Sequence, residues 1–505
     1  MLLQPITNPG KCARSLAVLL SIWAFIYLFS PFNLRLDKNE ISYNDEAIWG
    51  NRHDICRAYG WKPYQPRQSS DPPRKLYDLV LVTTELDLLE VRFNTTWDAV
   101  DYYVLVESAK TFTGRNKPLL LKQALDETPS RFETYKSKII YHQVQYPEDF
   151  SPPPTPPRGS GSGSGSASVS PWEDFHLNAM FDQVFPLLEA ETKSPMTNPN
   201  VNSDLQSSYP LSLSNSSSSS SKSSSPRRPH TNDILLLSLA PEIPRPHILG
   251  LLRECFFPER LTLSSKMHYY SFQFVRRPSW FSRTQDYGPG YIDRESREVE
   301  WSHPQATVYR GTGTRGKTVK MGGSAGLRYG SRSGVIAGIG GGKWWNGWMG
   351  KGTWAENWLA RWEGRETLRS ASWTCEACFP TLAQFLLKDD EVYGPGHRLD
   401  SLTNSDTEKE RIVRYVREGK DLWSDLHERE EGGKWVFEEV VNNTDVPSLL
   451  LGSEGKEGRR LGFLMERGGR SGGFRDYKVP RVGVVEDTEN VKEGEERVVA
   501  IGKQG

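Results

Sequence analysis

The segment that follows residue 233 carries the side chains best suited to chemistry. An apolar run from Ile234 to Leu237 is followed closely by Glu242, which opens the stretch 242–246 (Glu-Ile-Pro-Arg-Pro). A strand buried on both faces of a sheet reads as an unbroken apolar run, and ligands of open α/β sheets bind beyond the carboxyl ends of such strands. Glu242 is therefore the first candidate for a catalytic carboxylate. The alternative is structural: an acidic residue at a helix N-terminus, with Pro244 at an early helical position.

The elements that would position Glu242 alternate between strand and helix patterns. Residues 76–82 and 102–106 are apolar runs, and residues 138–142 form a third predicted strand. Thr84 and Asp87 predict a capping box at the start of a helix between the first two strands. This alternation predicts an α/β fold with a mainly parallel sheet and flanking helices. Tyr269, Tyr270, Phe272 and Phe274 are expected to pack in one further strand.

The N-terminus reads as a membrane anchor. Residues 16–34 are largely apolar between basic flanks, and their length approaches the roughly 17–20 residues that a spanning helix needs. A cleaved signal peptide is the alternative, but no small-residue cleavage site follows the apolar run. We therefore predict a single-pass type II protein with a cytoplasmic tail at 1–15, an anchor at 16–34, a stem at 35–75 and a main domain at 76–480. A polar tail at 481–505 completes the chain.

Cysteines and glycosylation sequons fit a lumenal main domain. Cys12 lies at the predicted cytoplasmic end of the anchor, and the other four cysteines could form two disulfides: Cys56, Cys255, Cys375 and Cys378. The Cys375-x-x-Cys378 spacing is also compatible with half of a zinc site, although no suitable second pair accompanies it. Sequons that would require a lumenal location occur at Asn94, Asn215 and Asn442.

Low-complexity inserts interrupt the predicted domain at 151–170, 191–231 and 311–370. Proline, glycine and serine dominate these stretches, which are unable to support a packed core. The third insert begins with a G-x-G-x-x-G match at Gly311, but glycine rather than a helix follows, so we expect a loop instead of a dinucleotide site. An amphipathic helix is expected between the first two inserts, from Trp172 to Phe185.

Several ordered blocks resemble glycosyltransferase family 17, the β-1,4-mannosyl-glycoprotein 4-β-N-acetylglucosaminyltransferases. The blocks run from about residue 76 to residue 477 outside the inserts, and they are 85–90, 106–114, 242–246, 269–273, 301–306, 373–379 and 412–423. The resemblance implies a GT-A-like (Rossmann-like) fold in a Golgi or endoplasmic reticulum membrane protein. It also implies a UDP-GlcNAc donor, a mannose-containing N-glycan acceptor and a divalent cation, usually Mn²⁺.

Two residues depart from the family pattern in ways that matter for chemistry. Family members carry an Asp-x-Asp before the Glu-Ile-Pro block, and those aspartates align with Leu239 and Pro241. Neither residue can supply a side-chain oxygen to a cation that bridges the donor diphosphate. Leu177 stands where the family usually has an arginine.

The resemblance assigns roles to further residues. Inversion at the anomeric carbon needs a base for the acceptor hydroxyl, and Glu242 is predicted to be that base or a carboxylate beside the cation. The predicted substrate contacts are Glu107, Lys110, Glu85, Asp87, Arg245, Trp301 and His303. Helix-dipole stabilisation alone would also explain Glu85 and Asp87, and solvated strand-end charges would explain Glu107 and Lys110.

Two other classes of function compete with an inverting hexosyltransferase. The loss of Asp-x-Asp suits a non-catalytic glycan-binding or scaffold protein of the same fold. The basic, glycine-rich stretch 311–351 suits single-stranded nucleic acid. However, the 63 basic and 63 acidic residues cancel, and a lumenal location would exclude most nucleic acid, so no nucleic-acid partner is expected.

Overall fold

The computed structural model describes residues from 52 to 477, with gaps. The described ranges are 52–66, 73–127, 129–151, 170–190, 226–278, 291–292, 299–301, 303–311, 365–393, 405–422, 435–451, 460–468 and 472–477. The predicted anchor, the cytoplasmic tail, Cys12, Asn215 and the polar tail lie outside these ranges. Within them, no helix has the length and apolarity required to span a membrane.

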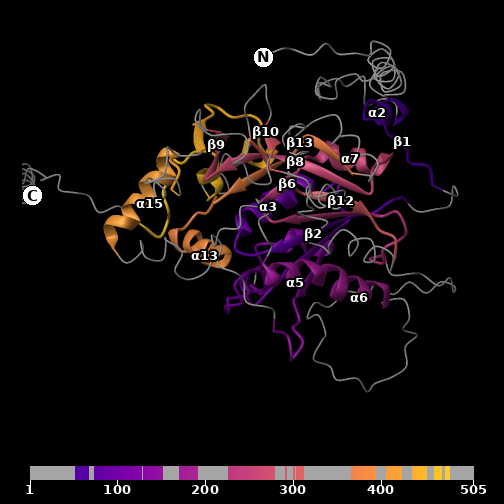
Figure 1. Ribbon diagram of the computed structural model, residues 1–505, viewed down its shortest axis with the longest axis horizontal. Coiled ribbons are helices and arrows are strands. Elements are labelled where there is room, and N and C mark those ends of the chain that lie inside the picture. Colours follow the sequence, from indigo (N-terminus) through magenta and orange to yellow (C-terminus); the bar gives the residue numbers. More distant parts are fainter. Residues whose placement is uncertain are drawn as a thin grey trace, which may run out of the picture.

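A large sheet forms the centre of the molecule (Figure 1). Its main path runs β10-β11-β8-β12-β5-β2-β3-β4. The strands of this path are β2 (Leu76–Val82), β3 (Tyr102–Glu107), β4 (Ile139–Gln143), β5 (Ile234–Leu239), β8 (Arg260–Tyr269), β10 (Tyr291–Ile292), β11 (Val299–Trp301) and β12 (Gln305–Val308). The three strands predicted from apolar runs are thus confirmed, and the apolar run before Glu242 is the buried strand β5.

Two layers of helices cover the parallel strands, because alternate residues of β2, β3 and β5 face opposite sides. Leu76 and Val80 face one core with α3 (Leu86–Thr96), α4 (Leu120–Asp126) and α7 (Pro246–Glu254). Tyr77 and Leu79 face a second core with α5 (Pro171–Ala179) and α6 (Phe185–Ala190), which a π-helical turn at Met180–Val184 joins. Figure 1 shows α5 and α6 on one side of the strands and α7 on the other.

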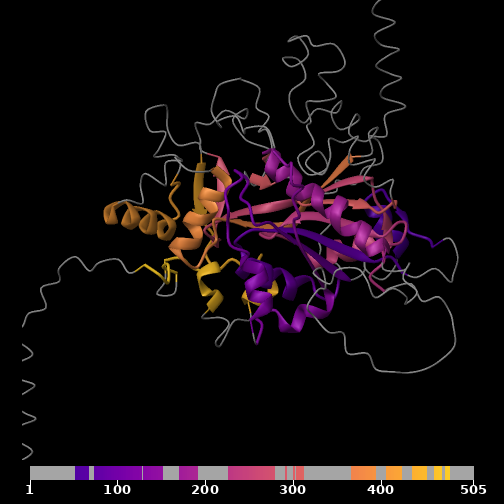
Figure 2. The ribbon, with the colours of Figure 1, turned by 90° about the horizontal axis from the view of Figure 1, so that it is seen from below.

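The C-terminal half adds a second group of strands to the sheet. β13 (Arg365–Glu376) pairs in parallel with β8 and antiparallel with β6 (Glu242–Pro244), and β14 (Trp435–Glu439) pairs with β9 (Ser271–Pro278). The helices of this half are α13 (Leu382–Tyr393), α15 (Asp406–Glu418) and α16 (Ser448–Leu451). Figure 2 shows α13 and α15, in orange, at the end of the molecule away from the indigo α2.

The sheet is mixed, which corrects the prediction of a mainly parallel one. Only the β2–β3, β3–β4, β2–β5 and β8–β13 pairs are parallel among the described strands. β12 lies antiparallel between β5 and β8, and β8 turns back into β9 at Tyr270. Tyr270 has a positive φ of 64° at this turn, so the predicted single strand through Tyr269, Tyr270 and Phe272 is two antiparallel strands.

Part of the predicted stem belongs to the folded body. α2 (Arg52–Ala58) and β1 (Lys62–Pro63) pack there, and β1 pairs with β7 (Cys255–Phe256). Tyr59 and Trp61 are buried in the first core, and a disulfide joins Cys56 to Cys255. The sequence did not predict this packing, because residues 35–75 are mostly polar and their few apolar side chains are widely spaced.

The insert boundaries also differ from the prediction. β13 begins at Arg365, inside the predicted insert 311–370. Residues 226–228, inside the predicted insert 191–231, accept hydrogen bonds from the side chains of Lys75 and Tyr77. The expected helix between the first two inserts is confirmed as α5 to α6. The predicted capping box of α3 is wrong: Glu85 is the N-cap residue, and no side chain caps this helix.

Candidate functional site

The candidate site lies where the carboxyl ends of β2, β5 and β13 meet. Thr83, Thr84 and Glu85 follow β2, and Glu242 follows β5 after a short turn. Glu376 is the last residue of β13. These strands have the same direction. β2 is parallel to β5, and β13 is parallel to β8. β12 is antiparallel to both β5 and β8, so β5 and β8 also run in the same direction. Their carboxyl ends therefore lie along one edge.

Glu242 is buried and both of its carboxylate oxygens accept hydrogen bonds. The indole N–H of Trp301 donates to Oε1 (2.9 Å), and the backbone N–H of Leu239 donates to Oε2 (2.9 Å). Glu242 lies in strand β6 instead of at a helix N-terminus, and Pro246 rather than Pro244 is the early proline of α7. The predicted alternative, that Glu242 is an acidic residue at a helix N-terminus, is thus wrong. The carboxylate holds the β5–β6 turn and orients Trp301.

A buried arginine supports the same turn from below. Arg92 of α3 forms an ion pair with Asp78 (2.5 Å), and both side chains are fully buried. Its guanidinium also donates to the Ser238 hydroxyl (2.6 Å) and to the backbone carbonyl of Glu242. Arg92 thus fixes the end of β5, where the predicted site begins.

Glu85 is an ionised carboxylate held by Lys388 of α13. The two groups are 2.7 Å apart, and the Thr83 hydroxyl and the Thr84 backbone N–H donate to the other carboxylate oxygen. Burial alone would raise the pKa of Glu85, but the ammonium of Lys388 and these hydrogen bonds outweigh it and lower the pKa to about 2. Lys388 thereby ties α13 to the end of β2.

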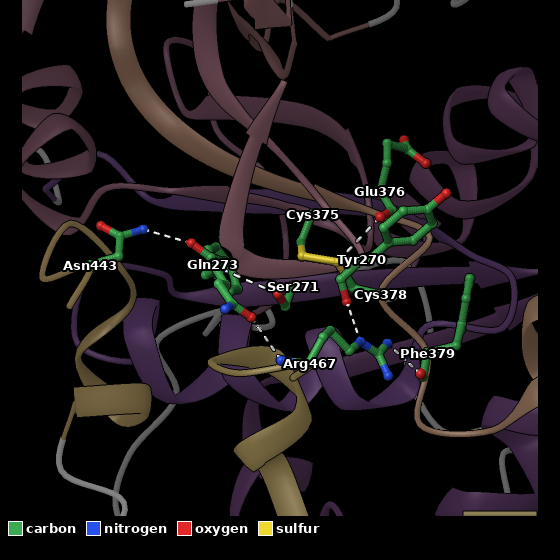
Figure 3. Close-up of a disulfide and its surroundings, with 10 residues drawn as sticks. Tyr270, Ser271, Gln273, Cys375, Glu376, Cys378, Phe379, Asn443 and Arg467 are labelled. Carbon is green, nitrogen blue, oxygen red and sulfur yellow. Dashed lines mark hydrogen bonds between the residues drawn. A yellow bond between two sulfur atoms is a disulfide. The ribbon is translucent and has the colours of Figure 1, made fainter. Parts of the chain in front are cut away.

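Glu376 differs from the other two carboxylates. Its side chain shares a face of the sheet with those of Thr374 and Glu242, because Thr374 is paired directly with Glu242 across β13 and β6 and side chains alternate along a strand. Figure 3 shows the carboxyl group pointing away from the Cys375–Cys378 disulfide and from Arg467. Burial raises the pKa of Glu376, the ammonium of Lys388 opposes this shift, and the carboxylates of Glu85 and Glu242 add to it.

His303 lies beside Trp301, the residue whose indole donates to Glu242, and a substrate contact for either residue stays a prediction. Their ring centroids lie 4.9 Å apart in an edge-to-face arrangement, and His303 is buried. The peptide bond between His303 and Pro304 is cis. The backbone carbonyl of His303 accepts from the hydroxyl of Ser265 (2.5 Å). His303 therefore forms part of the wall behind Trp301.

The remaining predicted contacts are engaged with other partners. Glu107 is buried and accepts from the backbone N–H groups of Leu121 (2.8 Å) and Lys122 (3.0 Å) at the start of α4, and burial raises its pKa. Lys110 donates to the side-chain oxygen of Asn116 (2.5 Å) in the loop after β3. Both residues hold local structure in this arrangement, and a substrate contact for either stays a prediction.

Asp87 and Arg245 are also engaged away from Glu242. Asp87 forms ion pairs with Arg131 (2.5 Å) and Arg460 (2.9 Å). Arg245 pairs with Asp445 (2.7 Å) and its guanidinium lies 4.2 Å from the ring centroid of Trp373. Trp373 neighbours Thr374 in β13, so this stack lies on the opposite face of the sheet from Glu242 and Glu376.

Other predictions concern positions around the site. Leu177, which replaces the family arginine, is fully buried in the core beneath α5. Four of the five cysteines form two disulfides, so the Cys375-x-x-Cys378 pair is not half of a zinc site here. Asn94 and Asn442 are exposed, as glycosylation would require.

The divalent cation that the family resemblance implies does not fit these residues. Leu239 and Pro241 offer no side-chain oxygen, and both oxygens of Glu242 already accept hydrogen bonds. Across the described ranges, no group of three or more His, Cys, Asp or Glu side chains is arranged to hold a metal ion. No step of the chemistry below is therefore assigned to a metal.

Comparison with known proteins finds partial similarity to one family of glycosyltransferases. The model of glycosyltransferase family 17 matches residues 21–150, which include β2, β3 and Glu85. The resemblance to glycosyltransferase family 17 is confirmed over that stretch. The human β-1,4-mannosyl-glycoprotein 4-β-N-acetylglucosaminyltransferase is 38% identical over 69 residues, 14% of this chain and 13% of the relative. The rat protein of that name is 36% identical over 69 residues, 14% of this chain and 12% of the relative.

The aligned part is therefore a small fraction of the curated relatives' length, and no solved structure matches the chain. The family 17 match ends at residue 150, whereas Glu242, Trp301 and Glu376 lie beyond it. The geometry of the C-terminal strands thus comes from the fold of this chain alone.

Sequence reasoning missed Thr374, Glu376 and Lys388 as members of the site. Glu376 stands between the two cysteines of a recognised block, but only the register of β13 against β6 places it beside Glu242. Together the site contains the half-buried carboxylate of Glu376, which can accept a proton. It also contains the ammonium of Lys388 and the aromatic ring of Trp301. Such groups suit the binding and activation of a sugar hydroxyl.

Proposed function

We propose that this protein transfers N-acetylglucosamine from UDP-GlcNAc to a mannose of a glycoprotein N-glycan. The family 17 match and the names of the relatives support a glycosyltransferase with this sugar. The observation that carries the proposal is the shared edge at the ends of β2, β5 and β13, where three glutamates and Lys388 lie together. A GT-A-like fold, with transfer that inverts the anomeric carbon, is part of the proposal.

The location of the protein follows from the same proposal. The apolar stretch 16–34 would anchor the chain in a Golgi or endoplasmic reticulum membrane with its body in the lumen. Two disulfides in the body support an oxidising compartment. Loss of core glycosylation at Asn94 and Asn442 in a protease-protected assay would contradict the lumenal location.

A glycan-binding protein without turnover is the second candidate, and one observation favours it. Leu239 and Pro241 remove the oxygen ligands on which metal-assisted transfer depends. Such a protein would bind N-glycans at the same edge without cleaving the donor.

Turnover of UDP-GlcNAc by the full chain separates the two candidates. We expect the chain to transfer GlcNAc to a biantennary N-glycan probe. This transfer should persist in EDTA, because the side chains of the site do not suit the binding of a cation. The matched variant is Leu239→Asp with Pro241→Asp, which restores the family pattern and is expected to make transfer respond to Mn²⁺. A chain that binds the glycan, leaves UDP-GlcNAc intact and gains turnover only in the double variant would be the binding protein.

A further inference from the structure

The three carboxylates at the edge differ in what already occupies their oxygens. Those of Glu85 accept from Lys388, Thr83 and Thr84, and those of Glu242 accept from Trp301 and Leu239. The carboxylate of Glu376 forms no hydrogen bond or ion pair with any residue of the described ranges, whereas its backbone carbonyl accepts from the backbone N–H of Tyr270 (2.9 Å). Glu376 alone among them keeps both oxygens available for a ligand.

A second observation points to a ligand at the same place. The hydroxyl of Thr374 is fully buried and has no hydrogen-bond partner in the described part of the chain. Thr374 lies two residues before Glu376 on the same strand, so both side chains emerge on one face. Buried polar atoms without a partner are rare in folded proteins, and a bound sugar hydroxyl would satisfy this one.

The backbone around Glu376 is rigidly held. The disulfide between Cys375 and Cys378 closes a tight loop at the end of β13, and Ala377 within it has a positive φ of 55°. The buried Arg467 donates to the backbone carbonyls of Tyr270 (2.8 Å) and Phe379 (2.6 Å) beneath this loop (Figure 3). A fixed backbone limits the positions that the carboxyl group can reach, which suits a group that must meet a bound hydroxyl.

We infer that Glu376 is the proton acceptor for the acceptor sugar, and that Glu242 is a positioning residue that orients Trp301. This inference rests on the proposed function. In the transfer step, the acceptor O–H bond breaks and its proton moves to the carboxylate of Glu376. The freed oxygen bonds to the anomeric carbon of GlcNAc, and the bond from that carbon to the UDP oxygen breaks, with its electron pair leaving on the diphosphate.

The charges that face Glu376 determine when it can accept the proton. Its acidic neighbours are Glu85, the N-cap residue of α3, and Glu242 of β6. Its cationic neighbours are Lys388 of α13 and Arg276 of β9. The raised pKa of Glu376 makes it a stronger base than an exposed glutamate. Transfer is accordingly expected to fall as the pH drops through that pKa, above the ordinary value of 4.5.

Glu376→Gln in the full chain tests the assignment, with UDP-GlcNAc and the biantennary glycan as probes. We expect transfer to fall about 100-fold or more, the usual range for loss of a general base, while the Kd for UDP-GlcNAc changes less than threefold. Glu376→Asp is expected to keep measurable transfer with a pH profile displaced from that of the wild type. The matched control is Glu133→Gln, which alters an exposed side chain.

The outcomes separate this inference from the proposed function. Transfer by Glu376→Gln within threefold of an active wild type would overturn the assignment and leave the proposed function standing. If Glu242→Gln instead abolishes transfer, while Glu376→Gln retains transfer that still falls at acidic pH, the base would be Glu242. A wild type that never transfers the sugar would overturn both.

Discussion

Two regions of the central sheet carry buried polar side chains that differ in how the protein satisfies them. In the parallel half, Asp78 pairs with Arg92 and Glu107 caps α4, so these buried charges are satisfied by the protein itself. In the C-terminal half, Thr374 has no partner and the carboxylate of Glu376 is open within the described ranges. Satisfied groups build a scaffold, whereas unsatisfied ones at a strand end mark the place where a ligand completes the bonding.

The strongest test of this comparison breaks the scaffold at its buried ion pair. Arg92→Met leaves Asp78 charged and unpaired in the core, and we expect the free energy of unfolding to fall by about 3–5 kcal/mol. Urea denaturation measures the change. The control is Lys122→Met, whose exposed pair with Asp126 is worth less than about 1 kcal/mol. Equal effects of the two variants would contradict the scaffold role.

The second test concerns Glu85, which joins the two halves through Lys388. The carboxylate has a folded pKa of about 2 against an ordinary 4.5, so its stabilisation is present above pH 4.5 and lost as the pH falls toward 2. Glu85→Gln is expected to lower stability by roughly 2–3 kcal/mol at neutral pH. The difference from wild type should shrink during acid titration. A difference that is independent of pH would rule out this ion pair as the cause.

How far the sequence predicts the fold also differs between the halves. Unbroken apolar runs identified β2, β3 and β5, because strands buried on both faces leave that signature. β13 was cut by a predicted insert boundary, and the turn at Tyr270 was read as continuous strand. Pairing between strands far apart in sequence decides those elements, and local pattern does not record it.

The site was predicted in part for the same reason. The family-like sequence blocks predicted Glu242, Trp301 and His303, and Trp301 contacts both of the others. Glu376 and Thr374 could not be placed beside them without the register between β13 and β6. The partners that engage Asp87 and Arg245 lie 373 and 200 residues away, at Arg460 and Asp445, so their structural use was invisible in the sequence.

The smallest expected effect sharpens the contrast at a single hydroxyl. Thr374→Val replaces a buried, unpartnered hydroxyl with a methyl group, and stability should rise by up to about 1 kcal/mol. Thr96→Val is the matched control, because the Thr96 hydroxyl donates to the backbone carbonyl of Arg92 (2.8 Å) and lies 2.9 Å from the hydroxyl of Tyr103. The free energy of unfolding of this control variant should fall by about 1 kcal/mol. Thermal unfolding of both variants shows whether their signs differ.

A crystal structure of the full chain with UDP-GlcNAc tests the central claim most directly. The account predicts that the GlcNAc ring lies at the carboxyl ends of β2, β5 and β13, on the face of the sheet that carries Thr374 and Glu376. A donor sugar bound on the opposite face, beside Trp373 and Arg245, or away from this edge altogether, would contradict it.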